Sequence, residues 1–237
     1  NQMNRDIVAA VGVANQNPDI GAIVLTGAGR GFCAGADIKD TFAARIDGDE
    51  SGAPTNNWVT FMRQSKPIIA AVNGAAVGVG VTMMLPFDVI VASDAARFGL
   101  AFVKMGVVPE LASSHFLVQR VGFSHASEMC LTGRLYSATE AYDRGLVNHV
   151  VSAAELMPKA FDIATEIAEN PALQLGMVKQ LLTENGSETN LVEVMQREGE
   201  LLAKAYASAE HKEAVSAFIE KRAPDFRKAA QAGKVTD

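Results

Sequence analysis

Two stretches rich in glycine and alanine are where the residue types and spacing of this sequence could support chemistry. The first, GRGFCAGADIKD, runs from Gly29 to Asp40, and the second, NGAAVGVG, runs from Asn73 to Gly80. A strand that leads through small residues into a helix presents backbone N–H groups at the positive end of that helix. Two such loops could converge on one oxygen atom and stabilise negative charge on it, as an oxyanion hole does. Close packing between a helix and a strand explains the spacing alone equally well.

Other catalytic and binding motifs fit this sequence poorly. Gly27-Ala28-Gly29 begins a dinucleotide-binding pattern, but Phe32 replaces its third glycine, and no Gly-Lys-Ser/Thr follows to complete a P-loop. Ser113, Ser114 and His115 include a nucleophile and a base, yet adjacent residues on a helix do not face each other. The two cysteines and four histidines form no cluster with metal-site spacing, so we expect no metal.

The overall charge and the cysteine content narrow the class of protein. The net charge is -6 over 237 residues, with no dense run of Lys or Arg, which argues against a nucleic-acid partner. Two cysteines are too few for a disulfide scaffold and fit a reducing compartment. The sequence does not start with the basic and apolar segments of a signal peptide.

The elements that must position the loops alternate between strand and helix in the first half of the sequence. Short apolar runs predict buried strands at 21–27, 66–74, 87–93 and 146–152. The apolar stretch 74–92 is long enough for a membrane span, but Pro86, Asp88 and its glycines favour a buried helix followed by a strand. Met83 and Met84 are expected in the core.

The remaining segments are predicted to be a surface loop and a series of helices. Residues 43–57 are polar and rich in turn formers, typical of a surface loop. Ser137 and Glu140 form a capping box that opens a short helix. Residues 155–221 have amphipathic helical spacing, interrupted near Asn170-Pro171 and Asn185-Gly186, and such helices usually pack on a neighbour.

The order of these motifs resembles the enoyl-CoA hydratase/isomerase (crotonase) family. The resemblance is carried by GRGFCAGADIKD, by KPIIAAVNGAAVGVGVTMMLPFDVIVASDAARFGL, by LTGRLYSATEAYDRGLVNHVV and by the ending FIEKRAPDF. It implies an α/β fold, a crotonase-like spiral of repeated ββα units with a C-terminal helical region. We expect a spiral core over 1–152, and over 153–237 a helical region that assembles the chain into a homotrimer or a dimer of trimers.

The same resemblance implies a site for an acyl-CoA thioester. Positions that match the family's oxyanion donors are the backbone N–H groups of Ala36 and Val79. Further substrate-binding positions lie in or near the two loops and near the C-terminus: Ala34, Gly35, Asp37, Ile38, Lys39, Gly78 and Lys221. Asp37 could instead cap the following helix, and the two lysines could be solvated surface residues. Coenzyme A is part of the substrate, and no separate cofactor is implied.

The resemblance also bears on the reaction. The family's hydratases activate water with two glutamates, and the matching positions here are Thr82 and Phe102, neither of which can act as a base. The stretch VVPELASSH instead resembles the peroxisomal-type Δ3-Δ2-enoyl-CoA isomerases, in which the glutamate corresponding to Glu110 is the catalytic base. A glutamate after proline in the first turn of a helix is also favoured by the helix dipole alone, by about 0.3–1 kcal/mol.

The predicted function is therefore Δ3-Δ2-enoyl-CoA isomerisation with Glu110 as the acid/base. The alternatives are an enoyl-CoA hydratase, an acyl-CoA thioester hydrolase, and a catalytically silent relative that binds acyl-CoA or a protein partner. A dinucleotide-dependent oxidoreductase is a more distant rival. We expect no membrane partner, and a location in the cytoplasm of a bacterium or in the peroxisome or mitochondrion of a eukaryote.

Overall fold

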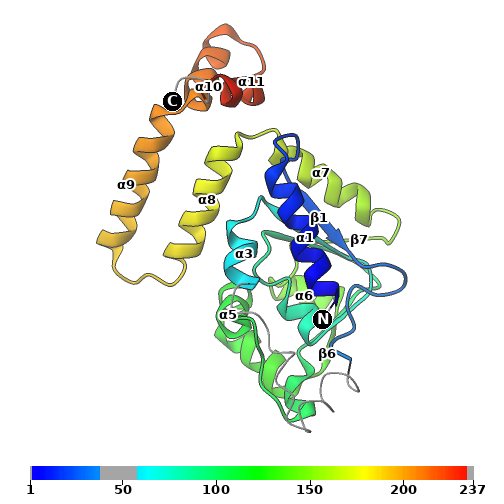
Figure 1. The fold of residues 1–237 in the computed structure, drawn as a ribbon. Coiled ribbons are helices and arrows are strands. Elements are labelled where there is room, and N and C mark those ends of the chain that lie inside the picture. The colour runs from blue at the N-terminus through cyan, green and yellow to red at the C-terminus, as the bar shows by residue number, and fades with distance from the viewer. Residues whose placement is uncertain (1, 38–57, 234–237) are drawn as a thin grey trace.

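Two small sheets form the centre of the molecule, which a computed structural model describes for residues 2–37 and 58–233 (Figure 1). The larger sheet is parallel throughout, in the order β1-β2-β4-β7, and its strands are β1 (Ile23–Thr26), β2 (Ile68–Val72), β4 (Val89–Ser93) and β7 (His149–Val151). The smaller sheet has the order β3-β5-β6, and its strands are β3 (Ala75–Val77), β5 (Arg97–Gly99) and β6 (Leu135–Ser137).

The chain passes from the larger sheet to the smaller one in each repeat. β2 is followed by β3 and the helix α4 (Val79–Thr82), and β4 is followed by β5 and the 3₁₀ helix η2 (Ala101–Met105). β3 and β5 pair in parallel, as β2 and β4 do. Two successive units of strand, strand and helix therefore stack on each other, which is the repeated ββα unit that the resemblance implied.

Helices surround the sheets and then continue beyond them. The remaining helices are α1 (Gln2–Gln16), α3 (Trp58–Gln64), α5 (Ser113–Thr132), α6 (Ala138–Asp143), α7 (Leu156–Ala168), α8 (Ala172–Asn185), α9 (Leu191–Ala207), α10 (Ala209–Glu220) and α11 (Phe226–Gly233). α7 packs against β1, β2 and β4, and α8 packs against α3. The last three helices extend away from the sheets, with α10 and α11 at the far end of the molecule (Figure 1).

The strands and helix boundaries predicted from the sequence are largely confirmed. Each predicted strand contains an observed one, and the capping box of Ser137 and Glu140 opens α6 with both of its hydrogen bonds present. A helix does follow the second glycine loop, and this helix, α4, has only four residues before a series of turns. The three strands of the smaller sheet were not predicted, because three residues are too few to show a period of two. No described helix is long and apolar enough to cross a membrane.

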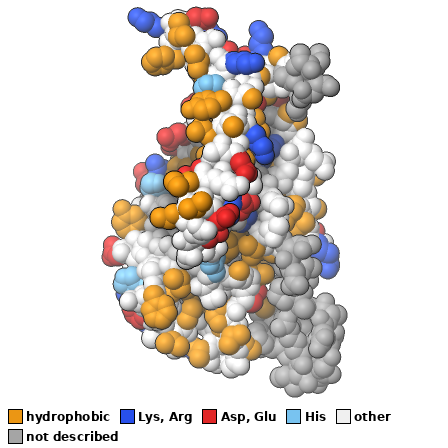
Figure 2. All heavy atoms as spheres, turned by 90° about the vertical axis from the view of Figure 1, so that its left-hand side faces the viewer, with side chains coloured by type: hydrophobic (Ala, Val, Ile, Leu, Met, Phe, Trp, Pro, Cys, Tyr) orange, Lys and Arg blue, Asp and Glu red, His pale blue; other side chains and the backbone are white. Residues whose placement is uncertain are grey.

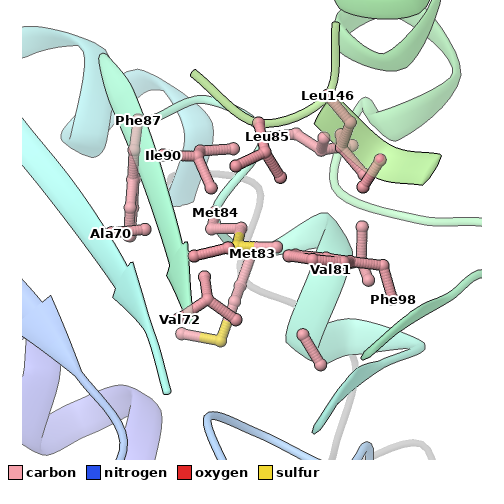
Figure 3. Close-up of a cluster of buried hydrophobic side chains, with 14 of the residues drawn as sticks. Ala70, Val72, Val81, Met83, Met84, Leu85, Phe87, Ile90, Phe98 and Leu146 are labelled. Atoms are coloured by element: carbon pink, nitrogen blue, oxygen red, sulfur yellow. The ribbon is translucent and has the colours of Figure 1, made fainter. Parts of the chain in front are cut away.

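The main core gathers side chains from β2, β4, α4, the turns after α4 and β5 (Figure 3). Val81, Met83, Met84 and Phe98 are at most 2% exposed there, which confirms the core position of the two methionines. Every residue of β2 is buried, because the strand has core on both faces. Burial of one such large side chain contributes about 1.5–3 kcal/mol, so this core holds α4 and the turns after it against the larger sheet.

A buried ionic cluster attaches the C-terminal helices to the sheets. Asp88 bonds Arg63 of α3 and Lys179 of α8, each at 2.8 Å. Burial lowers the pKa of Lys179, and the charge of Asp88 opposes that change. Because each cation would be costly if left unpaired, the cluster holds α8 in one place.

Hydrophobic side chains remain exposed beyond this attachment, as Figure 2 shows for the side that α8 and α9 form. On α9 and α10 they are Leu191, Val192, Met195, Leu202, Tyr206, Val215, Phe218 and Ile219.

Candidate active site

The two glycine-rich loops lie side by side. The N–H groups of Phe32 and Cys33 both donate to the carbonyl oxygen of Ala75 at 3.0 Å, and Val77 N–H donates to the carbonyl of Cys33 at 2.9 Å. Cys33 and Ala76 also form a parallel β-bridge. The first loop is therefore held along β3, directly before the second loop turns into α4.

Close packing of the two loops requires glycine at position 80. A Cβ atom at this position would lie 2.0 Å from the carbonyl oxygen of Cys33, well inside van der Waals contact. Gly78 has a different role, since its φ of 55° turns the chain into α4 in a conformation that other residues rarely adopt. The packing explanation of the small residues thus applies to Gly80, and it does not exclude a site at the ends of the loops.

The side chain of Asn73 forms hydrogen bonds with the backbone of the first loop. Its Nδ2 donates to the carbonyl of Gly29 at 2.9 Å, and its Oδ1 accepts from the N–H of Gly27 at 3.2 Å. The sequence indicated only a turn at Asn73-Gly74, because a side chain that bridges 44 residues leaves no local pattern.

Ala36 and Val79, the predicted oxyanion donors, are both half-buried on these loops. Among the described residues, neither N–H donates a hydrogen bond to the chain. Val79 is the first residue of α4, and the first N–H of a helix has no partner within it. With only four residues in α4, such a site would depend on the individual N–H groups and not on the dipole of a long helix.

Glu110 lies before α5 and not in its first turn. α5 begins at Ser113, so the preference of a helix dipole for a first-turn glutamate does not account for this residue. The intervening residues Leu111 and Ala112 have φ angles of 57° and 52°. Such conformations cost on the order of 1–3 kcal/mol each for residues other than glycine, and they persist only where the surroundings impose them.

The side chain of Glu110 is held by Thr82. Thr82 Oγ1 donates a hydrogen bond to Glu110 Oε1 at 2.6 Å, and Thr82 is completely buried at the last position of α4. The sequence indicated only that Thr82 cannot be a base. A contact across 28 residues could not be derived from the local pattern.

Phe102 is half-buried in η2, beside the second loop. Its ring comes within 4.0 Å of the position that a Cβ on Gly78 would occupy. Phe102 matches the second of the two glutamates of the family's hydratases, so an apolar ring lies near the second loop where a hydratase would have a carboxylate.

The other predicted substrate-binding residues are spread more widely. Ala34 and Asp37 are exposed on the first loop, with Gly35 half-buried between them. Ile38 and Lys39, the helix that Asp37 was expected to cap and the polar segment 43–57 lie outside the described residues.

Lys221 is not brought to the two loops. It directly follows α10 and is exposed, and α10 lies at the end of the molecule opposite β6 (Figure 1). Within the described ranges 2–37 and 58–233, no three His, Cys, Asp or Glu side chains come together as a possible metal site.

The chain is similar to known proteins along almost its whole length. A family model described as enoyl-CoA hydratase/isomerase matches residues 1–229. The probable enoyl-CoA hydratase echA8 of Mycobacterium tuberculosis is 37% identical over 95% of this chain and 87% of its own length. The 1,2-epoxyphenylacetyl-CoA isomerase of Escherichia coli is 32% identical over 95% of this chain and 88% of its own.

Solved structures give the same result for the fold. An enoyl-CoA hydratase from Polaromonas superposes with a TM-score of 0.85 at 32% identity, covering 92% of this chain and 86% of its own. The chain is therefore an enzyme of the enoyl-CoA hydratase/isomerase (crotonase) family and has the crotonase fold.

Proposed function

We propose that this enzyme converts Δ3-enoyl-CoA thioesters to Δ2-enoyl-CoA thioesters. The relatives support the substrate class, because their names all specify CoA thioesters as substrates or products. Coenzyme A enters as part of the substrate, and the reaction needs no other cofactor.

In this reaction, backbone N–H groups stabilise the negative charge and Glu110 transfers the proton. The N–H groups of Ala36 and Val79 bind the thioester oxygen and stabilise the charge that reaches it when a proton leaves C2. The carboxylate of Glu110 takes that proton, the double bond moves from C3–C4 to C2–C3, and the same carboxyl returns the proton at C4. No atom is gained or lost, so one carboxylate suffices.

The contact between Thr82 and Glu110 is the observation that carries this proposal. An α-helix rises about 1.5 Å per residue, so Val79 and Thr82 are only about 4.5 Å apart along the axis of α4. A carboxylate bound to the end of this turn is close to the donor at its start. The base and the oxyanion donor can then face the same few atoms of a substrate.

Hydration is the second candidate, because several relatives are named enoyl-CoA hydratases. Addition of water needs a group to activate it, and the family's hydratases use two glutamates for this. Thr82 and Phe102 replace both here, and the ring of Phe102 is apolar. We therefore place isomerisation first. Release of free CoA in the assays below would indicate thioester hydrolysis, and binding of acyl-CoA without turnover would indicate a non-catalytic relative.

We also propose that the C-terminal helices assemble the enzyme into a homotrimer or a dimer of trimers. The exposed hydrophobic residues of α9 and α10 support an apolar contact between copies. Lys221, remote from the loops of its own chain, would then serve the CoA of another copy. A location in the bacterial cytoplasm, or in the peroxisome or mitochondrion of a eukaryote, fits this function.

Turnover of a trans-3-enoyl-CoA and a trans-2-enoyl-CoA by the wild type and by Glu110→Gln tests the proposal. We expect the 3-enoyl substrate to be isomerised and the variant to be slower by about 10²–10⁴-fold, because it lacks the proton carrier. Glu166→Gln, on the exposed surface of α7, is the matched control and should retain full activity. Efficient hydration of the 2-enoyl substrate without isomerisation would overturn the proposal in favour of a hydratase.

A further inference from the structure

We propose that Thr82 is a positioning residue, whose hydroxyl fixes the carboxylate of Glu110 relative to the N–H of Val79. The inference rests on the proposed function, because it assigns Glu110 the proton transfer. It gives a role to Thr82, of which the sequence indicated only that it stands where the family's hydratases have a glutamate.

The length of the contact fits a hydrogen bond to an ionised carboxylate. O–H···O⁻ bonds measure about 2.5–2.7 Å, and the Thr82–Glu110 bond is 2.6 Å. Thr82 is 0% exposed, so bulk water does not compete for its hydroxyl. A carboxylate can only accept here, which makes Thr82 the donor.

Among the described residues, the hydroxyl has one other acceptor within reach, and it is a poorer one. The carbonyl oxygen of Val79 lies 3.5 Å from Thr82 Oγ1, at the limit of hydrogen bonding. A hydroxyl has a single hydrogen, so the shorter and charged contact takes it. Thr82 therefore donates its hydrogen bond to Glu110. The last residue of α4 thus holds the carboxylate, and its first residue, Val79, supplies the N–H for the oxyanion.

Glu110 is thus held at both ends. Its carbonyl accepts from the N–H of Ser113 at 3.1 Å, in the turn where Leu111 and Ala112 have positive φ. Its carboxylate end is held by Thr82. Strained turns concentrate at sites where a side chain must be aimed, and a glutamate aimed by its backbone alone would still rotate about its side-chain bonds.

The experiment compares variants that differ by one hydroxyl. Thr82→Val removes the hydroxyl with little change in shape, whereas Thr82→Ser keeps it. We expect the valine variant to lose kcat by about 10- to 100-fold, the usual effect of removing a hydrogen bond to a charged group, with KM unchanged. The serine variant should stay within a few-fold of the wild type.

Ser65→Ala is the matched control for loss of a buried hydroxyl. Ser65 is 4% exposed before the start of β2, and its Oγ donates to the carbonyl oxygen of Phe61 at 2.7 Å. Its removal should leave both kcat and KM unchanged. If Thr82→Val does not fold, Thr82→Ala and Thr82→Ser provide the same comparison, since these two differ only in the hydroxyl.

A second readout separates this inference from the proposed isomerisation. Exchange of the C2 proton of a saturated acyl-CoA with deuterium, followed by NMR, reports proton removal with no double bond to move. If 3-enoyl-CoA is not isomerised but exchange occurs, is lost in Glu110→Gln and is slowed in Thr82→Val, the proposed function fails and the role of Thr82 stands. A valine variant with wild-type kcat and exchange, or with only a raised KM, would overturn the role of Thr82.

Discussion

Gly80→Ala should disable the site more than it destabilises the fold. The added Cβ would lie 2.0 Å from the carbonyl oxygen of Cys33, and real Cβ contacts are essentially never below 3.0 Å. The first loop and α4 would have to separate by about 1 Å. The two nearest atoms that this Cβ would meet are the carbonyl oxygen and carbonyl carbon of Cys33, so no flexible side chain can absorb the movement.

The two effects of this substitution differ in size. Overpacking costs about 1–3 kcal/mol, and alanine in place of glycine in a helix returns about 0.5–1 kcal/mol. The free energy of unfolding should therefore fall by at most about 2.5 kcal/mol. A 1 Å misplacement of groups that bind the reacting atoms can cost about 10²-fold in rate. We expect a folded protein with about one hundredth of the wild-type kcat/KM.

Urea denaturation and turnover of 3-enoyl-CoA measure the two quantities on the same preparation. Gly12→Ala in α1 is the matched control, because its Cβ would meet nothing within 4 Å. That variant should gain about 0.5–1 kcal/mol of stability and keep full activity. Wild-type turnover by Gly80→Ala would refute the argument that contact between the loops sets the geometry of the site.

Two further predictions concern stability. Ala112→Gly should raise the free energy of unfolding, measured in urea, by about 0.5–1 kcal/mol. Relief of the positive φ is worth about 1–2 kcal/mol, which exceeds the cost of about 0.4–1 kcal/mol from the entropy that glycine adds to the unfolded chain. A lower stability would contradict the strain assigned to this turn. The capping hydrogen bond from the backbone of Ser137, together with Arg134, lowers the pKa of Glu140 to about 2 from 4.5. The stability that Glu140 contributes is therefore complete above about pH 4.5 and is lost as the pH falls toward 2. In thermal melts, Glu140→Gln should flatten this part of the curve of stability against pH. An unchanged curve would exclude Glu140 as the source of the pH dependence.

Local patterns in the sequence were enough to predict the main strands, the start of α6 and the candidate residues Ala36 and Glu110. The run IIAAV is apolar on both faces, and it forms β2, which is buried on both faces. Ser137 and Glu140 are three residues apart, so their capping box could be recognised without any tertiary contact. The family motifs likewise led from GRGFCAGADIKD to Ala36, and from VVPELASSH to Glu110.

Tertiary structure alone decided how these parts meet. The bond between Thr82 and Glu110 spans 28 residues, and Asn73 reaches a loop 44 residues away. α5 starts only at Ser113, after two residues with positive φ, whereas local preference would have extended the helix back toward Pro109. Periodicity records which face of an element is buried, but not which distant side chain it will meet. That choice is made when the chain folds and buried polar groups such as the Thr82 hydroxyl must find partners.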